Sequence, residues 1–279
     1  MATSGAVPQK ASPGTSAGAA KRLIINADDF GFTRDVNAGI IHAHRMGVLT
    51  STTLMANGEA FDDAVKLARE TPSLDVGVHL VLIQGRSVLT GRAFPETWKQ
   101  LLLSRLTWQT NAYMELRAQI QKVLAAGIRP THLDSHKHTH ILPEVFRAVI
   151  RLAHEFSIPN VRLPLDASVP YAKLACRLAD RHYRRLAVPY NVQMTDHFRG
   201  FRLTGSLTEQ TLAETLSSLP EGTTELMCHP GFLGPELKEA QTRLKESRMR
   251  ELSALISPRI RQLMAVEGVR LEAFGPDRR

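Results

Sequence analysis

Cysteine is scarce in this sequence, and long apolar runs are missing. Among its 279 residues only Cys176 and Cys228 are cysteines, and they lie far apart. A disulfide framework needs more cysteines than this, so we expect reduced thiols in a cytoplasmic protein. No apolar run has the length needed to span a membrane. Residues 1–20, rich in Ala, Gly, Ser, Thr and Pro, lack the apolar core of a secretory signal and are expected to form a disordered tail before a single domain over 21–279.

Several familiar binding motifs are also missing. The turn after the first expected strand has no Gly-x-Gly-x-x-Gly sequence, which argues against a dinucleotide site, and no phosphate-binding P-loop is present.

The formal net charge is +8. Its simpler interpretation is a basic, solvated surface; the alternative is a preference for anionic surfaces such as lipid headgroups. Because no DNA- or RNA-binding motif stands out, we expect no nucleic-acid partner.

What is present is an alternation of strand and helix patterns. Strands are expected over residues 23–31, 48–55, 74–83, 130–135, 161–163, 191–194, 224–228 and 269–274. Helices are expected over residues 33–45, 59–70, 113–126, 143–156, 172–186, 208–218 and 236–255. This alternation predicts an α/β fold with a parallel sheet and helical crossovers. Seven or eight such units favour a closed or distorted (β/α) barrel, with an open doubly wound sheet as the alternative.

Acids and histidines follow the apolar runs. Asp28 and Asp29 end the first expected strand, and His79 and His136 come at the ends of two others. In α/β folds the carboxyl ends of strands carry the chemistry. Two histidines and one carboxylate (His79, His136 and Asp29) make a facial metal site with open positions, and Asp28 could then be a general base. The simpler alternatives are a polar turn at Asp28–Asp29 and a core histidine at His79.

Two further segments carry candidate site residues. Residues 132–140 hold four histidines and an acid, which share one face if the segment is extended. There Asp134 is expected to orient His136 or another ligand, while His138 and His140 contact substrate or the metal ligands, or else form a solvent-facing loop.

His229 follows Cys228, but neighbours on a strand point to opposite faces, which excludes a Cys–His dyad. We therefore expect Cys228 to be buried and His229 to face the site. There it would protonate a leaving amine or steady an oxyanion, the alternative being a cap at the strand end.

The expected helix over residues 172–186 is strongly basic. A solvated face is its simpler interpretation, and an amphipathic contact with a membrane surface is the alternative.

The motifs resemble those of one known family. They are Asn-Ala-Asp-Asp-Phe-Gly (26–31), Leu-Thr-Ser-Thr-Thr (49–53), Gly-Val-His-Leu (77–80), Thr-His-Leu-Asp-Ser-His-Lys-His (131–138) and Glu-Leu-Met-Cys-His-Pro (225–230). In this order they resemble the YdjC-like carbohydrate deacetylases, also called the ChbG/HpnK family, over nearly all of residues 22–274.

The resemblance implies a distorted, TIM-like (β/α) barrel of the polysaccharide deacetylase type. It also implies one divalent metal ion, zinc or magnesium, and hydrolysis of an N-acetylated amino sugar to an amine and acetate. Carried over by motif, Asp29, His79 and His136 are the metal ligands, Asp28 is the base and His229 is the acid. A homodimer is expected on the same basis.

Two substrate branches are known in this family. One acts on chitooligosaccharides; the other, HpnK-like, is associated with hopanoid biosynthesis and an N-acetylglucosaminyl hopanoid. Residues 79–86, 161–164 and 195–200 resemble the second branch, and the basic helix would suit its lipid-linked substrate, whereas Asp134-Ser135-His136 resembles the first.

Two other classes of function remain open from the sequence. One is a glycosidase that pairs Asp28 or Asp29 with Asp134. The other is a non-catalytic module that binds a sugar or a lipid.

Overall fold

The computed structural model describes residues 20–103, 109–163, 165–166 and 173–275. The expected tail over 1–20 lies outside the described residues apart from its last position. The strands are β1 (Lys21–Phe30), β2 (Ser51–Leu54), β3 (Asp75–Leu80), β4 (His132–Ser135), β5 (Asn160–Val161), β6 (His197–Arg199), β7 (Gly222–Cys228) and β8 (Val269–Leu271). The α-helices are α1 (Arg34–Met46), α2 (Phe61–Glu70), α3 (Trp98–Leu103), α4 (Gln109–Ala125), α5 (Pro143–Glu155), α6 (Lys173–Ala187), α7 (Glu209–Ser217), α8 (Pro235–Glu239), α9 (Glu246–Leu255) and α10 (Pro258–Val266).

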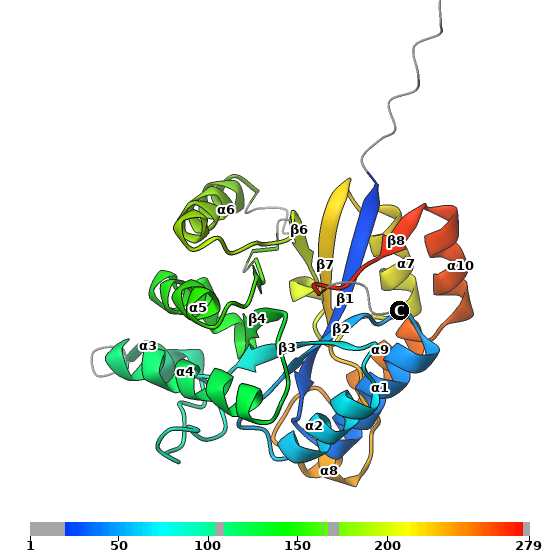
Figure 1. Cartoon of the computed structure of the whole chain (residues 1–279). Coiled ribbons are helices and arrows are strands. Elements are labelled where there is room, and N and C mark those ends of the chain that lie inside the picture. The colour runs from blue at the N-terminus through cyan, green and yellow to red at the C-terminus, as the bar shows by residue number, and fades with distance from the viewer. Residues whose placement is uncertain (1–19, 104–108, 164, 167–172, 276–279) are drawn as a thin grey trace, which may run out of the picture.

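All strand pairs in the sheet are parallel. The order is β5-β4-β3-β2-β1-β7-β6, and β8 pairs with the first residues of β1. Figure 1 shows helices surrounding these strands. The path ends at β5 and β6, and a parallel bridge joins Asn160 of β5 to Gln193, which precedes β6 in the sequence. The expected distorted (β/α) barrel is confirmed, and the strand order excludes the doubly wound alternative.

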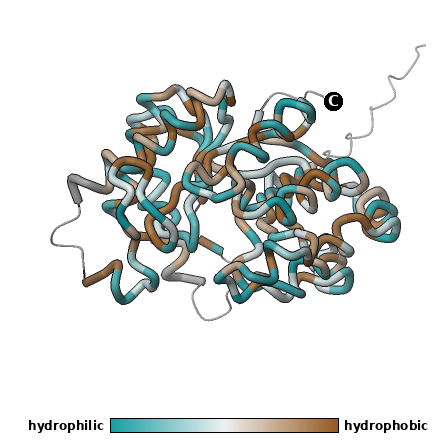
Figure 2. The backbone as a smooth tube through the Cα atoms, turned by 90° about the horizontal axis from the view of Figure 1, so that it is seen from below, coloured by the Kyte–Doolittle hydropathy of each residue, from teal (hydrophilic) through white to brown (hydrophobic). Residues whose placement is uncertain are grey.

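Local sequence signals place the first helix after the first strand. The Thr33 side chain accepts a hydrogen bond from the Val36 amide and begins α1, and Gly47 follows its end. The buried face of α1 includes Val36, Ile40 and Ile41. Along the surrounding helices hydrophilic and hydrophobic residues alternate, as Figure 2 shows. This pattern is typical of helices that bury one face against a sheet.

Two expected elements differ clearly from the structure, and one helix was not expected. Residues 191–194 form only the bridge at Gln193, whereas β6 begins at His197. The expected helix over 236–255 is two helices, α8 and α9, separated by an irregular segment that buries Leu244. No Gly or Pro marks that break, so periodicity alone could not reveal it. The expectation also missed α10, which has Pro258 in its first turn.

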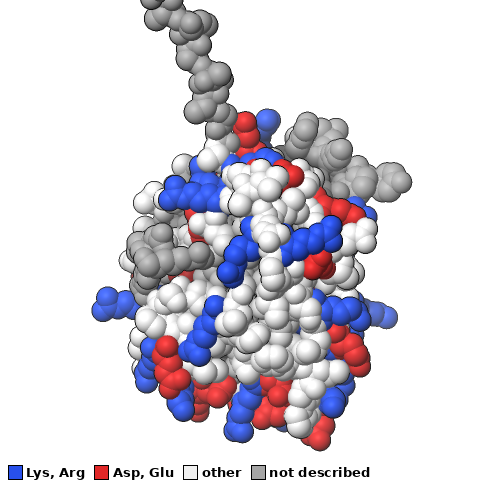
Figure 3. All heavy atoms as spheres, turned by 90° about the vertical axis from the view of Figure 1, so that its right-hand side faces the viewer, with Lys and Arg blue, Asp and Glu red and all other residues white. Residues whose placement is uncertain are grey.

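Charges of both signs are spread over the face that carries α10. Figure 3 shows Lys and Arg interspersed with Asp and Glu on this side of the molecule. The basic helix over 172–186 is α6, on the other side in Figure 1. Its Arg184 bonds Asp180 and the carbonyl oxygen of Thr195, so this cation is committed within the chain. In the described part of the chain, every helix is too short or too polar to cross a membrane.

Candidate metal and catalytic site

A cavity of about 580 Å³ opens at the carboxyl ends of the strands. It is lined by Asp28, Asp29, His79, Gln84, Trp98, His136, Lys137, His138, Phe201, Thr204, His229, Gln241, Thr242, Arg243, Leu244 and Arg248. The parallel sheet brings these residues together although they are spread over more than 200 positions in the sequence. The cavity lies where α/β folds place their chemistry.

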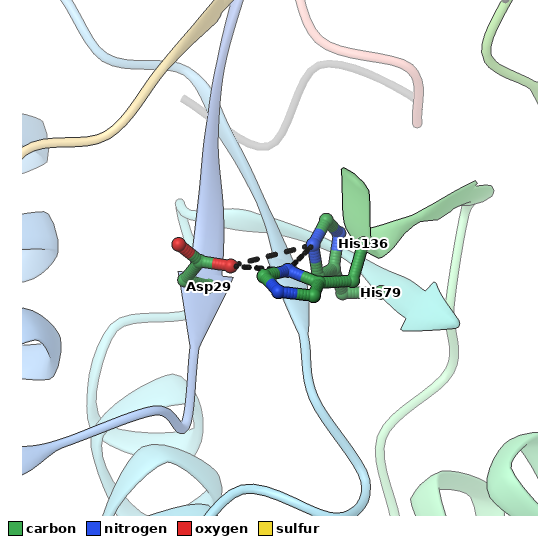
Figure 4. Close-up of side chains that lie close together, drawn as sticks. All are labelled: Asp29, His79 and His136. Carbon is green, nitrogen blue, oxygen red and sulfur yellow. Dashed lines mark hydrogen bonds and ion pairs between the residues drawn. The ribbon is translucent and has the colours of Figure 1, made fainter. Parts of the chain in front are cut away.

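Asp29, His79 and His136 all line this cavity, and Figure 4 shows their side chains pointing toward one another. Asp29 Oδ1 lies 3.4 Å from His79 Nε2 and 3.1 Å from His136 Nδ1. The two imidazole nitrogens lie 3.3 Å apart. Three ligand atoms from three different strand ends therefore face one point.

The backbone at the end of β1 sends its two acids in different directions. Asp29 has a left-handed φ of 71°, and the pairing of β1 with β2 is irregular between Ala27 and Phe30. The Gly31 amide donates to the Asn37 side chain on α1, which holds the turn in place. A left-handed residue breaks the strict alternation of a strand. Asp29 consequently faces the histidines while Asp28 faces the interior of the barrel.

Asp134 orients His79. Its Oδ1 lies 2.8 Å from His79 Nδ1, and its Oδ2 accepts a hydrogen bond from Thr53. Burial alone would lower the pKa of His79, but the charge and hydrogen bond of Asp134, a hydrogen bond with Asp29 and the charge of Asp28 raise it to about 10. This cluster of acids therefore holds a cation, here the proton on His79. From the sequence, Asp134 could orient either His136 or another ligand. In the structure it contacts His79.

Arg162 is fully buried and joins three carboxylates. Its guanidinium donates to both oxygens of Asp28, at 2.8 and 2.6 Å. It also contacts Asp134 and Glu225, each at 2.7 Å. Burial opposes ionisation of Asp28, but Arg162 outweighs it and holds the pKa of Asp28 well below its usual range. Burial raises the pKa of Glu225 to about 7 despite the same arginine.

A second buried arginine holds Asp29. Arg248 on α9 donates to Asp29 Oδ2 at 2.6 Å, and burial of Asp29 is outweighed by this charge, so its pKa lies well below the usual range. The arginine side chain passes Gly231, where an added Cβ would lie 3.2 Å from Arg248 Cδ. Since Arg248 occupies Oδ2, Asp29 offers Oδ1 alone to the two histidines.

The donor set fits a divalent metal ion. Ligands about 2.1 Å from a metal in tetrahedral or octahedral geometry are about 3.0–3.4 Å from one another. The three separations among Asp29, His79 and His136 fall in this range. Asp134 fixes the tautomer of His79 so that Nε2 faces the common point, as carboxylates behind metal-binding histidines do. We therefore take Asp29, His79 and His136 as the residues that would hold the ion.

His229 also lines the cavity. Its backbone amide donates to Glu251 Oε2, whereas its imidazole Nδ1 has no hydrogen-bond partner among the described residues. Burial lowers the pKa of His229 to about 4 and raises that of Glu251 to about 7. Its neighbour Cys228 is buried and contacts the Asn26 carbonyl oxygen, as the alternation of strand faces predicts.

His138 and His140 lie in the turn after β4 and have different surroundings. The strand ends at Ser135, and Lys137 and His138 have left-handed backbone angles, so the segment 132–140 does not extend with its histidines on one face. His138 lines the cavity between the Phe198 and Phe201 rings. His140 is fully buried against Ser135 and is not among the described residues that line the cavity. Its expected contact with substrate or the metal ligands stays a prediction.

The residues that the sequence analysis did not assign to the site are mostly buried charges. They are Arg162, Glu225, Arg248 and Glu251. Arg162 and Glu225 interrupt apolar strand sequences, and that signal could have identified them because charges are seldom buried unpaired. Arg248 and Glu251 lie in a helix with many charged residues, and nothing in the sequence distinguishes them from its solvated side chains.

His132 allows the effect of burial on the protonation of an imidazole in this protein to be tested. It is fully buried between Asn26 and Phe274, and burial lowers its pKa to about 4. In the unfolded chain this histidine takes up a proton below about pH 6.5, whereas in the folded protein it stays neutral down to about pH 4. The free energy of unfolding therefore falls as the pH is lowered from about 6.5 to about 4, by about 3 kcal/mol in all.

Urea unfolding in EDTA across this pH range measures the effect. In His132→Gln the slope of unfolding free energy against pH should be smaller by about 1.4 kcal/mol per unit. The exposed His182→Gln is the matched control and should keep the wild-type slope. An unchanged slope in His132→Gln would contradict the proposed neutral state of this buried imidazole.

Fold and site together define a (β/α)-barrel protein with a candidate metal centre at the carboxyl ends of its strands. The model of the YdjC-like protein family matches residues 22–266, and the chain belongs to this family. The resemblance seen in the motifs is thereby confirmed.

Curated relatives cover nearly the whole chain. Carbohydrate deacetylases from Brevibacillus brevis and Geobacillus stearothermophilus are each 34% identical to it, over 91% and 90% of this chain and 98% and 96% of theirs. A solved structure from Enterococcus faecalis, described as a candidate cellobiose-phosphate cleavage protein, is 28% identical with a TM-score of 0.78, covering 91% of this chain and 98% of its own. The lactam utilization protein from Thermus thermophilus shares the fold, with a TM-score of 0.50 at 13% identity over 90% of this chain and 99% of its own.

Proposed function

We propose that this protein is a metal-dependent N-deacetylase. It hydrolyses the acetamide of an N-acetylglucosamine-containing substrate to a free amine and acetate. The observation that carries the proposal is the convergence of Asp29, His79 and His136 beside an Asp28 that Arg162 holds by both oxygens. The carbohydrate deacetylases among its relatives support the same class of reaction.

The chain's own residues divide the work. A divalent ion held by Asp29, His79 and His136 would supply a Lewis acid that polarises a carbonyl and acidifies water. Asp28 accepts a proton from the water that attacks the acetyl carbon, and Arg162 keeps its carboxylate pointed at the cavity floor. His229 gives a proton to the amine nitrogen as the C–N bond breaks, so the products are the amine and acetate.

The proton on His229 has to be acquired during the reaction. With a pKa of about 4, the imidazole is neutral at pH 7 before the reaction begins. Negative charge that develops on the acetyl oxygen favours the protonated form, because a nearby anion raises the pKa of a histidine. Its Nδ1 has no partner among the described residues and is free to exchange a proton.

Other side chains that line the cavity are suited to bind a sugar. Trp98 and the half-exposed Phe201 supply aromatic surface, while Gln84 and Thr204 supply groups that can hydrogen-bond hydroxyls. A largely apolar pocket with a few placed polar groups is typical of small-molecule sites. His138, neutral because burial holds its pKa well below the usual range, adds a further polar contact.

Zinc and magnesium are both consistent with the ligand types. Two imidazoles favour zinc or another transition metal, and open positions for water suit magnesium. We propose one divalent ion per chain.

The substrate branch is proposed from the sequence motifs and from one relative. A chitooligosaccharide and an N-acetylglucosaminyl hopanoid are the two candidates. The Enterococcus protein is named for a phosphorylated disaccharide, which favours the soluble oligosaccharide. Membrane contact by α6 and a homodimer stay predictions.

A glycosidase has less support from the geometry. It needs two carboxyl groups that flank the bond to be cleaved. Asp28 and Asp134 are instead joined beneath the cavity by Arg162, and Asp134 is fully buried.

The experiment is to identify the products from N,N′-diacetylchitobiose and from an N-acetylglucosaminyl lipid, each with zinc or magnesium. We expect acetate in equal amounts with new amine, and no new reducing ends. New reducing ends without acetate would indicate a glycosidase. Binding of either sugar without any product would indicate a non-catalytic module.

A further inference from the structure

We infer that Glu251 is a positioning residue that ties His229 to the cavity wall formed by residues 200–205. This inference rests on the proposed function, in which His229 is the proton donor and the wall contacts the sugar. Glu251 lies on α9 and is 1% exposed, so its carboxylate can act only on groups inside the protein.

Both oxygens of Glu251 are occupied, and each one serves a different loop. Oε2 accepts the backbone N–H of His229 at 2.5 Å, directly after β7. Oε1 accepts the backbone N–H of Gly205 at 3.2 Å, directly after the 3-10 turn Phe201–Leu203. Charge-assisted hydrogen bonds to backbone amides are strong, and burial removes water as a competitor. One side chain therefore sets the separation of two loops that lie 24 residues apart in the sequence.

The two loops carry groups with different proposed tasks. The segment before Gly205 contributes Phe201 and Thr204 to the cavity wall, and Phe201 is 50% exposed there. The other loop contributes the His229 imidazole. Its Nδ1 is 4.0 Å from Glu251 Oε2 and has no hydrogen-bond partner among the described residues, so Glu251 fixes the backbone and leaves the ring able to exchange a proton.

The same helix also reaches the metal ligands. Arg248, three residues before Glu251, holds Asp29 Oδ2. Residues three apart lie on one face of a helix. One face of α9 thus contacts the end of β1 through Arg248 and the end of β7 through Glu251, and it fixes the proposed acid relative to the proposed metal site.

A carboxylate is needed for this arrangement. Two backbone N–H donors need two acceptors, and the carboxylate provides one oxygen for each. Glutamine has the same shape but a single oxygen, so its amide NH₂ would face one of the two N–H groups and release that loop. Glu251→Gln is therefore a small change in volume with a specific loss of one contact.

The expected kinetic signature separates Glu251 from the residues that it positions. Phe201→Ala should raise KM with kcat little changed, and His229→Gln should lower kcat with KM little changed. Glu251→Gln should do both, each by about tenfold, because displacing a positioned group even slightly reduces the rate. Glu246→Gln, an exposed change at the start of the same helix, is the matched control and should alter neither by more than about twofold.

The assay measures acetate release at pH 8, where Glu251 is ionised. A second measurement needs neither activity nor a folded variant: amide hydrogen exchange in the wild-type protein, followed by NMR. The amides of His229 and Gly205 should be strongly protected and, if Glu251→Gln folds, at least one should become exchangeable. Rapid exchange of both amides in the wild type would overturn the inference, as would an effect of Glu251→Gln on kcat or KM alone. If the wild type releases no acetate, the proposed function fails, and the exchange experiment still tests the positioning.

Discussion

Replacing Arg162 with glutamine is expected to lower the free energy of unfolding by about 3–5 kcal/mol. The change would leave Asp28, Asp134 and Glu225 facing one another without their shared cation, 0–3% exposed. Breaking a buried ion pair costs this much because the remaining charge can neither reach water nor find another partner. Protonation of Glu225, whose pKa is already raised to about 7, relieves part of the repulsion.

Urea unfolding at pH 7.5 measures this loss. Arg270→Gln is the matched control, since Arg270 pairs with Glu272 at 3.9 Å while its own side chain is 74% exposed. Exposed pairs of this kind contribute little, so the control should unfold like the wild type. If Arg162→Gln were as stable as Arg270→Gln, the three acids would not depend on Arg162 for their charge balance.

The second large effect is expected for Asp28→Asn. Acetate release should fall by about 10²–10⁴-fold, the contribution typical of a positioned general base. Asparagine keeps the shape of the side chain, and Arg162 keeps Asp134 and Glu225 as partners. Because Asp29, and not Asp28, groups with both His79 and His136, the variant should still bind the metal ion.

Measuring metal affinity by calorimetry together with the activity distinguishes the role of Asp28 from that of Asp29. Asp29→Asn should lose the ion and the activity together, since Asp29 Oδ1 is the only carboxylate oxygen close to both His79 and His136 among the described residues. The exposed Asp62→Asn on α2 is the control and should retain both. Loss of metal from Asp28→Asn, or more than a tenth of the wild-type activity in it, would show that the two roles are assigned to the wrong residues.

The fold was predictable because its signals are local. Alternating apolar runs, the cap at Thr33 and the stop at Gly47 place β1 and α1 to within two residues. Short elements were harder. β6 has three residues and pairs with β7, so its position depends on the sheet rather than on its own composition. The irregular segment between α8 and α9 is held by contacts around the cavity that no local pattern encodes.

The polar site residues at the ends of strands could be predicted from the sequence, but the buried charged residues that support them could not. Asp28, Asp29, His79 and His136 follow apolar runs, so their meeting point could be inferred from a parallel sheet. The direction of each side chain could not, because it depends on the left-handed backbone of Asp29. Arg248 reaches Asp29 across 219 positions, a partnership that only tertiary structure reveals.

The arrangement has one electrostatic logic. Arg162 and Arg248 each stabilise one acid of the Asp28–Asp29 pair, and both acids stay ionised despite their burial. Asp28 is thereby kept as a carboxylate beside the cavity, and Asp29 keeps one oxygen for the histidines. The two adjacent carboxylates can perform different tasks because their counterions come from different strands and helices.

The central claim is that Asp29, His79 and His136 hold an ion on which catalysis depends. The most direct test is to strip the protein of metal with EDTA, remove the chelator, and titrate zinc or magnesium while measuring acetate release from N,N′-diacetylchitobiose. We predict almost no activity in the stripped protein and a rise to a plateau, with calorimetry giving one bound ion per chain. Full activity in the stripped protein would contradict the account.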